Sequence, residues 1–178
     1  MKHLSSVILG CALAIPAFAQ DAKTNAAADM PPPGQFFPAS AAVLTAPLVL
    51  TNDCFYLASA AADMVEVADG GKAVFNFTIT NAGDYVIETL VNADDENANS
   101  FFVNVDAQPV DPDMIWDIEV TTEFEKRVIS WRGTGDSAND EFAPKRFTLA
   151  PGAHKLIIVG REPGALLKSL TLRPAPKQ

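Results

Sequence analysis

The densest group of polar side chains in the sequence is the run from Asp94 to Asn99, which reads Asp-Asp-Glu-Asn-Ala-Asn. Carboxylate and amide oxygens at this density suit Ca²⁺, which binds about six to eight oxygen ligands. The spacing differs from that of an EF-hand loop, and the glycine that such a loop requires is missing. Two interpretations therefore stand: Asp94, Asp95 and Glu96 bind calcium, or the run is a solvated acidic turn.

Residues for catalysis are scarce. His154 is the only histidine beyond the N-terminal segment, and it follows the turn sequence Pro151-Gly152-Ala153, where we expect it to brace the loop. The sequence contains no Gly-x-Ser-x-Gly elbow, no glycine-rich phosphate loop and no Cys/His metal spacing. Carboxylates are abundant, so composition alone leaves a glycosidase pair open. We nevertheless predict that the protein is not an enzyme.

The N-terminal segment predicts export. Residues 1–19 combine Lys2, a short apolar stretch and the small-residue ending Ala17-Phe18-Ala19, which is the pattern of a cleaved signal peptide. A second route is lipoprotein anchoring at Cys11, which follows Ile8-Leu9-Gly10 and is the less favoured interpretation. We expect a periplasmic or extracellular protein, with Cys54 as a buried small hydrophobic side chain rather than a reactive thiol.

The overall charge argues against two classes of partner. The 22 acidic residues outnumber the 13 basic ones and give a formal net charge of −9. Such a surface repels phosphate backbones and anionic lipid headgroups, so nucleic acid and membrane surfaces are poor partners. Past the signal segment, no stretch is long and apolar enough to span a membrane, so we predict no transmembrane segment.

The elements that must position any site are short strands. Residues 20–42 are rich in alanine and proline and predict an extended linker, so the domain is expected to cover 43–178. From there the apolar residues recur at every second position, as at Phe75, Phe77 and Ile79. Turn signals such as Asn81 to Asp84 separate the strands. The expected strands cover 74–79, 85–91, 101–105, 114–118, 127–131, 146–149, 155–159 and 167–172. This pattern predicts an all-β fold, an antiparallel β-sandwich or jelly roll.

An ordered set of short motifs resembles a known family. The set comprises 83–87 (Gly-Asp-Tyr-Val-Ile), 99–106 (Asn-Ser-Phe-Phe-Val-Asn-Val-Asp), Trp116-Asp117, 128–131 (Val-Ile-Ser-Trp), 147–149, 151–156 and 160–167. It resembles the galactose-binding-like β-sandwich domains of the family 6 and family 35 carbohydrate-binding modules, over residues 65–173. The resemblance implies a jelly roll and non-catalytic binding of a polysaccharide or glycan.

The resemblance also directs attention to residues that could hold a sugar. Apolar sugar faces stack on aromatic rings, for which Trp116, Trp131 and Tyr56 are the candidates. Hydroxyls need polar partners, which Asn97, Asn99 and Arg132 could supply from adjoining loops. Both tryptophans have a second interpretation as core residues, and the pair Arg161-Glu162 is expected to be a structural ion pair or a loop brace rather than a ligand contact.

Two further expectations follow from the resemblance. The families commonly hold a structural calcium with a carboxylate in the last strand, and the matching position here is Lys168, whose positive charge opposes a metal. No catalytic domain accompanies the sandwich in this sequence. The alternative function is therefore an envelope structural or protein-interaction domain without a sugar site, with envelope proteins as partners.

Overall fold

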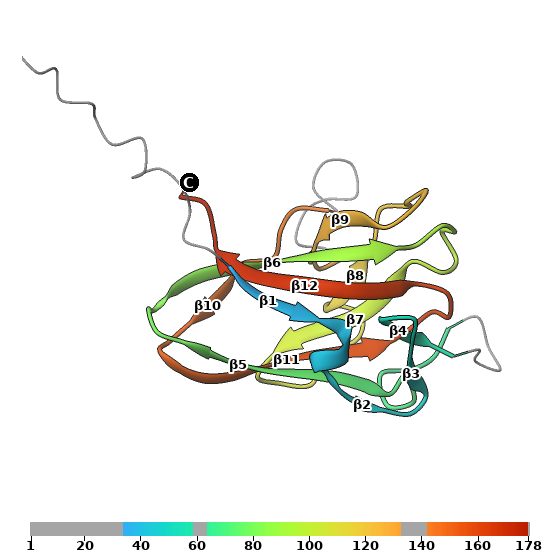
Figure 1. The fold of residues 1–178 in the computed structure, drawn as a ribbon, viewed down its shortest axis with the longest axis horizontal. Helices are drawn as coiled ribbons and strands as arrows, with labels where there is room; N and C mark the ends of the chain where they lie inside the picture. The colour runs from blue at the N-terminus through green and yellow to red at the C-terminus, as the bar shows by residue number, and fades with distance from the viewer. Residues whose placement is uncertain (1–33, 59–63, 133–141, 178) are drawn as a thin grey trace, which may run out of the picture. The chain divides into compact units, whose positions relative to one another are not determined.

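The computed structural model describes residues 34–58, 64–132 and 142–177, which lie in one compact unit, residues 31–178. The signal segment 1–19, Cys11 and most of the predicted linker lie outside the described residues. The described chain forms two antiparallel sheets that pack face to face, which confirms the predicted all-β sandwich. In Figure 1 the sheet that contains β6 and β12 lies above the sheet that contains β5 and β11.

One sheet has seven strands in the order β10-β6-β12-β4-β3, with β1 paired to β12 and β9 paired to β6. The other has five strands in the order β2-β5-β11-β7-β8. The strands are β1 (Gln35–Pro38), β2 (Val43–Thr45), β3 (Leu48–Thr51), β4 (Cys54–Leu57), β5 (Lys72–Ile79), β6 (Gly83–Asn92), β7 (Ser100–Val105), β8 (Ile115–Asp117), β9 (Glu125–Val128), β10 (Phe147–Leu149), β11 (Gly152–Gly160) and β12 (Leu166–Pro174). A single 3₁₀ turn, η2 (Ala39–Ala41), follows β1 in this part of the chain.

The alternating pattern explains how each sheet buries one face. In β5, Phe75, Phe77 and Ile79 are buried while Asn76 and Thr78 are exposed. Successive side chains of a strand point to opposite faces, so this order gives one apolar and one solvated face. The expected strand positions from residue 72 onward are confirmed, with bounds shifted by a few residues.

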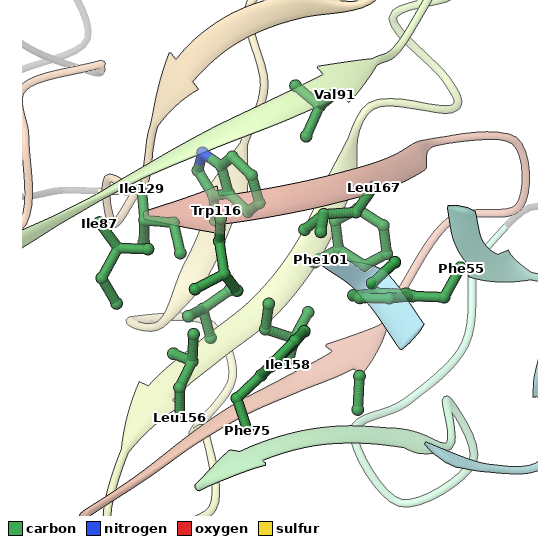
Figure 2. Packing of buried hydrophobic residues seen from close by; sticks show 14 of the residues in the cluster. Phe55, Phe75, Ile87, Val91, Phe101, Trp116, Ile129, Leu156, Ile158 and Leu167 are labelled. Atoms are coloured by element: carbon green, nitrogen blue, oxygen red, sulfur yellow. The ribbon is translucent and has the colours of Figure 1, made fainter. Parts of the chain in front are cut away.

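The core between the sheets is rich in aromatic rings. Phe55, Phe75 and Phe101 lie close together, with the ring centroid of Phe55 6.2 Å from that of Phe75 and 6.1 Å from that of Phe101. Figure 2 shows these rings beside aliphatic side chains from both sheets, including Ile87 and Ile158. This packing fixes the strands, and the strands in turn position the loops at each end of the sandwich.

The linker is shorter than predicted at its C-terminal end. Residues 35–38 form β1, which pairs with β12 in the register Gln35↔Leu172 to Pro38↔Ser169. The prediction that the domain begins at Val43 is wrong, because Phe37 packs against the core, 6.2 Å from the ring of Phe75. Among the described residues, no helix is long and apolar enough to cross a membrane.

Candidate functional site

A hollow with a volume of about 690 Å³ lies at one end of the sandwich. We call it the loop-end cleft. It is formed by the segment between β6 and β7, the end of β8 with the residues that follow it, Arg132 and Phe142 from between β9 and β10, and the segment after β11. The side chains that matter most for its chemistry are Glu96, Asn99, Asp117, Glu119, Arg132 and Phe142.

The back wall of the loop-end cleft is a buried ion pair. Arg161 and Glu162 are both almost fully buried, and a guanidinium N–H of Arg161 donates to Glu162 Oε1 and to the hydroxyl of Ser100. The second carboxylate oxygen of Glu162 accepts the backbone N–H of Asn99 at 3.1 Å. This confirms that Arg161-Glu162 is a structural pair, and it fixes where Asn99 enters the cleft.

Asn99 itself is held from two sides. Its side-chain Nδ2 donates to the carbonyl of Ile118 at 2.8 Å, while the N–H of Ile118 donates to the carbonyl of Asn99 at 2.8 Å. These bonds connect the start of β7 to the end of β8, and they orient the amide before any ligand arrives. No described residue donates a hydrogen bond to its Oδ1 atom.

Of the two arginines that line the cleft among the described residues, the exposed one is Arg132, which is paired with Asp117. The guanidinium donates two hydrogen bonds to the carboxylate, from Nε to Oδ2 at 2.7 Å and from Nη2 to Oδ1 at 2.6 Å. Such a two-point contact fixes the plane of the guanidinium. Asp117 is nearly buried, whereas the Arg132 side chain is 43% exposed, so the pair presents its positive member to the cleft.

The aromatic ring at the rim is Phe142, which is 48% exposed. It lines both the loop-end cleft and an adjoining hollow of about 260 Å³, and the two hollows share Asp117, Ile118 and Glu119. Phe142 thus places an accessible apolar ring beside polar groups in one hollow, which is the combination of surfaces that ligand sites use. Phe142 is the functional candidate that the sequence interpretation missed.

The comparisons with known proteins concern the fold. No family model matches the sequence, and the comparison with curated proteins found no match. Among solved structures, similar chains include a family 35 module from Clostridium thermocellum (TM-score 0.51, 16% identity, covering 79% of this chain and 98% of that one) and a family 35 module from Paenibacillus barcinonensis (0.52, 12%, 80% and 100%). In its fold, the chain resembles family 35 carbohydrate-binding modules.

The same fold occurs within larger enzymes. A Podospora anserina β-(1,4)-mannanase with a family 35 module superimposes with a TM-score of 0.55 at 14% identity, over 82% of this chain. The chain spans only 28% of the length of that mannanase. By contrast, it covers nearly the full length of the two separate family 35 modules.

Within this family 35 fold, the structure brings together only part of the predicted ligand set. Asn99 and Arg132 both line the loop-end cleft. Asn97 is exposed but donates its N–H and its side-chain Nδ2 to Asp95 Oδ1, as in a local turn. Tyr56 is half-buried on β4 and is not a lining residue of the cleft.

Of its two interpretations, core residue or sugar platform, Trp116 fits the first. The residue is only 1% exposed and its ring stacks on Phe101 at a centroid distance of 6.0 Å. Figure 2 shows the ring among Ile87, Ile129 and Phe101. Its neighbours explain the outcome: β8 pairs with β7 in the register Phe101↔Trp116, which places both rings on the inner face.

Trp131 is half-buried and already has partners on its ring and its nitrogen. The indole N–H donates to the carbonyl of Val103 at 2.9 Å, and the ring meets the edge of Phe147 at 6.0 Å. The ammonium of Lys145 lies 3.9 Å from the ring centroid, within cation–π range. Stacking on this face would have to displace Lys145, so Trp131 fits its core interpretation better than its ligand interpretation.

The acidic run from Asp94 to Glu96 lies open to solvent. Asp94, Asp95 and Glu96 are exposed, and two hydrogen bonds from Asn97 lower the pKa of Asp95. In the described ranges, no three acidic, histidine or cysteine side chains are grouped as a metal ion would require. Lys168 is exposed on β12, with its ammonium 5.3 Å from the ring centroid of Phe124.

His154 braces the other end of the sandwich, as expected from its place after a turn. Its Nδ1 lies 2.6 Å from Asp106 Oδ2, its Nε2 lies 2.8 Å from the carbonyl of Ala150, and its ring stacks on Phe77. The hydrogen bond to Asp106 raises the pKa of His154, with a smaller contribution from Ala150. Cys54 is buried as predicted, and this burial raises the pKa of its thiol.

Proposed function

We propose that the protein is an exported, non-catalytic carbohydrate-binding module whose ligand site is the loop-end cleft. The observation that carries the proposal is the exposed ring of Phe142 beside Asn99 and Arg132, in a cleft of about 690 Å³ on a sandwich with the family 35 fold. This volume lies within the range of about 300–1,000 Å³ that ligand sites occupy.

The cleft offers both kinds of contact that a sugar ring needs. The apolar face of a pyranose ring packs against an aromatic ring, and the Phe142 ring is accessible for that contact. Hydroxyl groups donate and accept hydrogen bonds, and Asn99 and the paired Arg132 supply oriented groups of both types. Because these groups are held by their own partners before a ligand arrives, little entropy is lost in ordering them.

The absence of catalysis is supported by how the cleft uses its carboxylates. A glycosidase needs two carboxyl groups that can act on the scissile bond. Here Asp117 is bonded to Arg132 at two points, and Glu162 is bonded to Arg161 and to the backbone of Asn99. These contacts engage the two buried carboxylates of the cleft and leave neither Asp117 nor Glu162 available as an acid or nucleophile, while Glu96 and Glu119 are exposed at its rim.

Export is supported by the sequence pattern of residues 1–19, which ends in Ala17-Phe18-Ala19. A protein released to the periplasm or the exterior would meet cell-wall or environmental polysaccharides. Fractionation of cells that express the full chain tests this part: the protein is expected outside the cytoplasm, with its N-terminus at Gln20. Retention in the cytoplasm with an intact N-terminus would contradict export.

The binding proposal is tested on a broad glycan array, followed by affinity electrophoresis in polysaccharide gels with the full chain. Phe142→Ala is expected to weaken retention about tenfold, since a lost ring contact of this kind is worth roughly 1–1.5 kcal/mol. The matched control is Phe36→Ala, which removes an even more exposed ring, 63% accessible, from β1. The control should leave retention unchanged, and both variants should keep the melting temperature.

A second function is favoured by the burial of Trp116 and by the lysine that covers Trp131. Both observations remove predicted sugar platforms, and Phe36, Val43 and Leu50 expose apolar side chains on the first three strands. An envelope structural or protein-interaction domain would use such a surface. If the folded protein binds no glycan on the array, this alternative is favoured over glycan binding.

A further inference from the structure

The loop-end cleft carries more negative than positive side chains. Among the described residues, four carboxylates line it, from Glu96, Asp117, Glu119 and Glu162, against two guanidinium groups, from Arg132 and Arg161. Both guanidinium groups are bonded to carboxylates of the cleft itself, at Asp117 and Glu162. The two remaining acidic residues, Glu96 and Glu119, are exposed at the rim.

An anionic ligand that took the Nε and Nη2 edge of Arg132 as a two-point partner would have to compete with Asp117, which already holds both atoms. The contact between Arg132 and Asp117 has two hydrogen bonds of 2.6 and 2.7 Å, and the Asp117 side chain is only 11% exposed. Drawing Arg132 away would leave this carboxylate buried without its partner, which is strongly unfavourable. The Arg161 guanidinium is less accessible still, because Ser100, Glu162 and Met64 surround it.

The exposed carboxylates at the rim, Glu96 and Glu119, also disfavour the binding of an anionic ligand. Glu119 is paired with Arg127 at 3.5 Å, but its side chain is 65% exposed, so its charge faces solvent in front of the cleft. No described residue forms an ion pair with Glu96. Carboxylates repel a ligand anion, whereas their oxygens accept hydrogen bonds from neutral hydroxyl groups.

We infer that the loop-end cleft selects uncharged sugars and excludes glycans that bear carboxylate, sulfate or phosphate groups. The inference rests on the proposed glycan binding and adds the class of ligand. It follows from the pairing of both arginines within the cleft and from the acidic rim, and it would not follow from the overall net charge alone. A cleft built for uronic acids would instead keep an arginine without an internal carboxylate partner.

The test compares each sugar chain with a carboxylated copy of itself. A neutral β-glucan, a galactan and a mannan are oxidised at C6 to their uronate forms, and binding of the full chain to both forms is measured at low salt. The neutral forms that bind should lose at least about tenfold in affinity on oxidation. The double variant Glu96→Gln/Glu119→Gln should narrow this difference, because it removes two rim charges without changing side-chain size.

The matched control is Asp113→Asn, which removes an exposed carboxylate from the segment between β7 and β8, away from the residues that line the cleft. It should leave the ratio of the two affinities unchanged. Equal or tighter binding of the oxidised forms would overturn the inference while leaving the glycan-binding proposal intact. Binding of no form, neutral or oxidised, would overturn the proposed function and this inference with it.

Discussion

The loop-end cleft can be compared with the end of the sandwich that holds Asp106, Trp131 and His154, which we call the braced end. Both contain an aromatic ring beside charged side chains, but only the cleft leaves the ring exposed. At the braced end, Trp131 is covered by Lys145, and the Asp106 carboxylate is bonded to His154 and to the backbone N–H of Lys155. At the cleft, the Phe142 ring is left exposed beside a paired arginine. An aromatic ring and a charge therefore indicate a ligand site only where the ring has an open face, which depends on its neighbours.

Replacement of the core tryptophan should give the largest loss of stability. Trp116→Ala removes a ring that is 1% exposed and stacked on Phe101, and a Trp-to-Ala change in a core costs about 3–5 kcal/mol of unfolding free energy. Urea denaturation measures this loss, with Phe142→Ala as the control at less than about 0.5 kcal/mol. A stable Trp116→Ala variant that no longer retains glycan would restore Trp116 as a ligand residue.

Replacement of Trp131 should cost less stability than Trp116→Ala and more than Phe142→Ala. Trp131→Ala removes the hydrogen bond to Val103 and the edge contact with Phe147, at a cost of about 1–3 kcal/mol because the ring is half-buried. Trp131→Phe keeps an aromatic ring but loses the N–H donor, so it should cost less in the same denaturation experiment. If instead both variants unfold like the parent and lose glycan retention, the braced end is a binding site and the comparison fails.

The His154–Asp106 contact should make a small contribution that depends on pH. The folded pKa of His154 is raised by Asp106, so this contribution is fully present below the unfolded value of about 6.5 and is lost as pH rises through the folded pKa. Burial raises the pKa of Asp106, but hydrogen bonds from His154 and Lys155 outweigh it and lower the pKa overall. The stability that Asp106 contributes is therefore lost at acidic pH, as the pH falls through the lowered pKa of this carboxylate.

Asp106→Asn isolates this contribution. Asparagine tolerates the positive φ of 63° at this position, so the backbone is not strained by the change. From about pH 5 to pH 8, the unfolding free energy of the parent should fall measurably more than that of the variant, by a few tenths of a kcal/mol and at most about 1 kcal/mol, as measured by urea denaturation. Parallel curves for the two proteins would show that the pair contributes no pH-dependent stability.

Addition of a calcium chelator should have the smallest effect on stability. The exposed run Asp94-Asp95-Glu96 is not part of a three-ligand group among the described residues, and Lys168 stands where the resemblance places a calcium-binding carboxylate. A chelator should therefore change the melting temperature by less than about one degree. A fall of several degrees that added Ca²⁺ reverses would establish a calcium site and revise the electrostatics of the cleft.

Much of the fold could be predicted because it depends on local pattern. The alternation around Phe75 and Phe77 and the turn at Pro151-Gly152 are properties of neighbouring residues, and they located the strands from residue 72 onward. The expected strands did not include β1 to β4, and β1 was missed because its proline-flanked segment resembles a linker. It becomes a strand only because β12 offers an edge and the core accommodates Phe37.

The sandwich, the excess of negative charge and the loops that carry Asn99 and Arg132 were all evident from the order of the residues. Which aromatic ring stays exposed emerged only in the folded chain, because burial depends on strand pairing between distant residues, as in Phe101↔Trp116. The same holds for the arginines: their charge is evident in the sequence, but their internal pairing with Asp117 and Glu162 requires segments that meet only after folding. That pairing leads to the inferred preference for uncharged sugars.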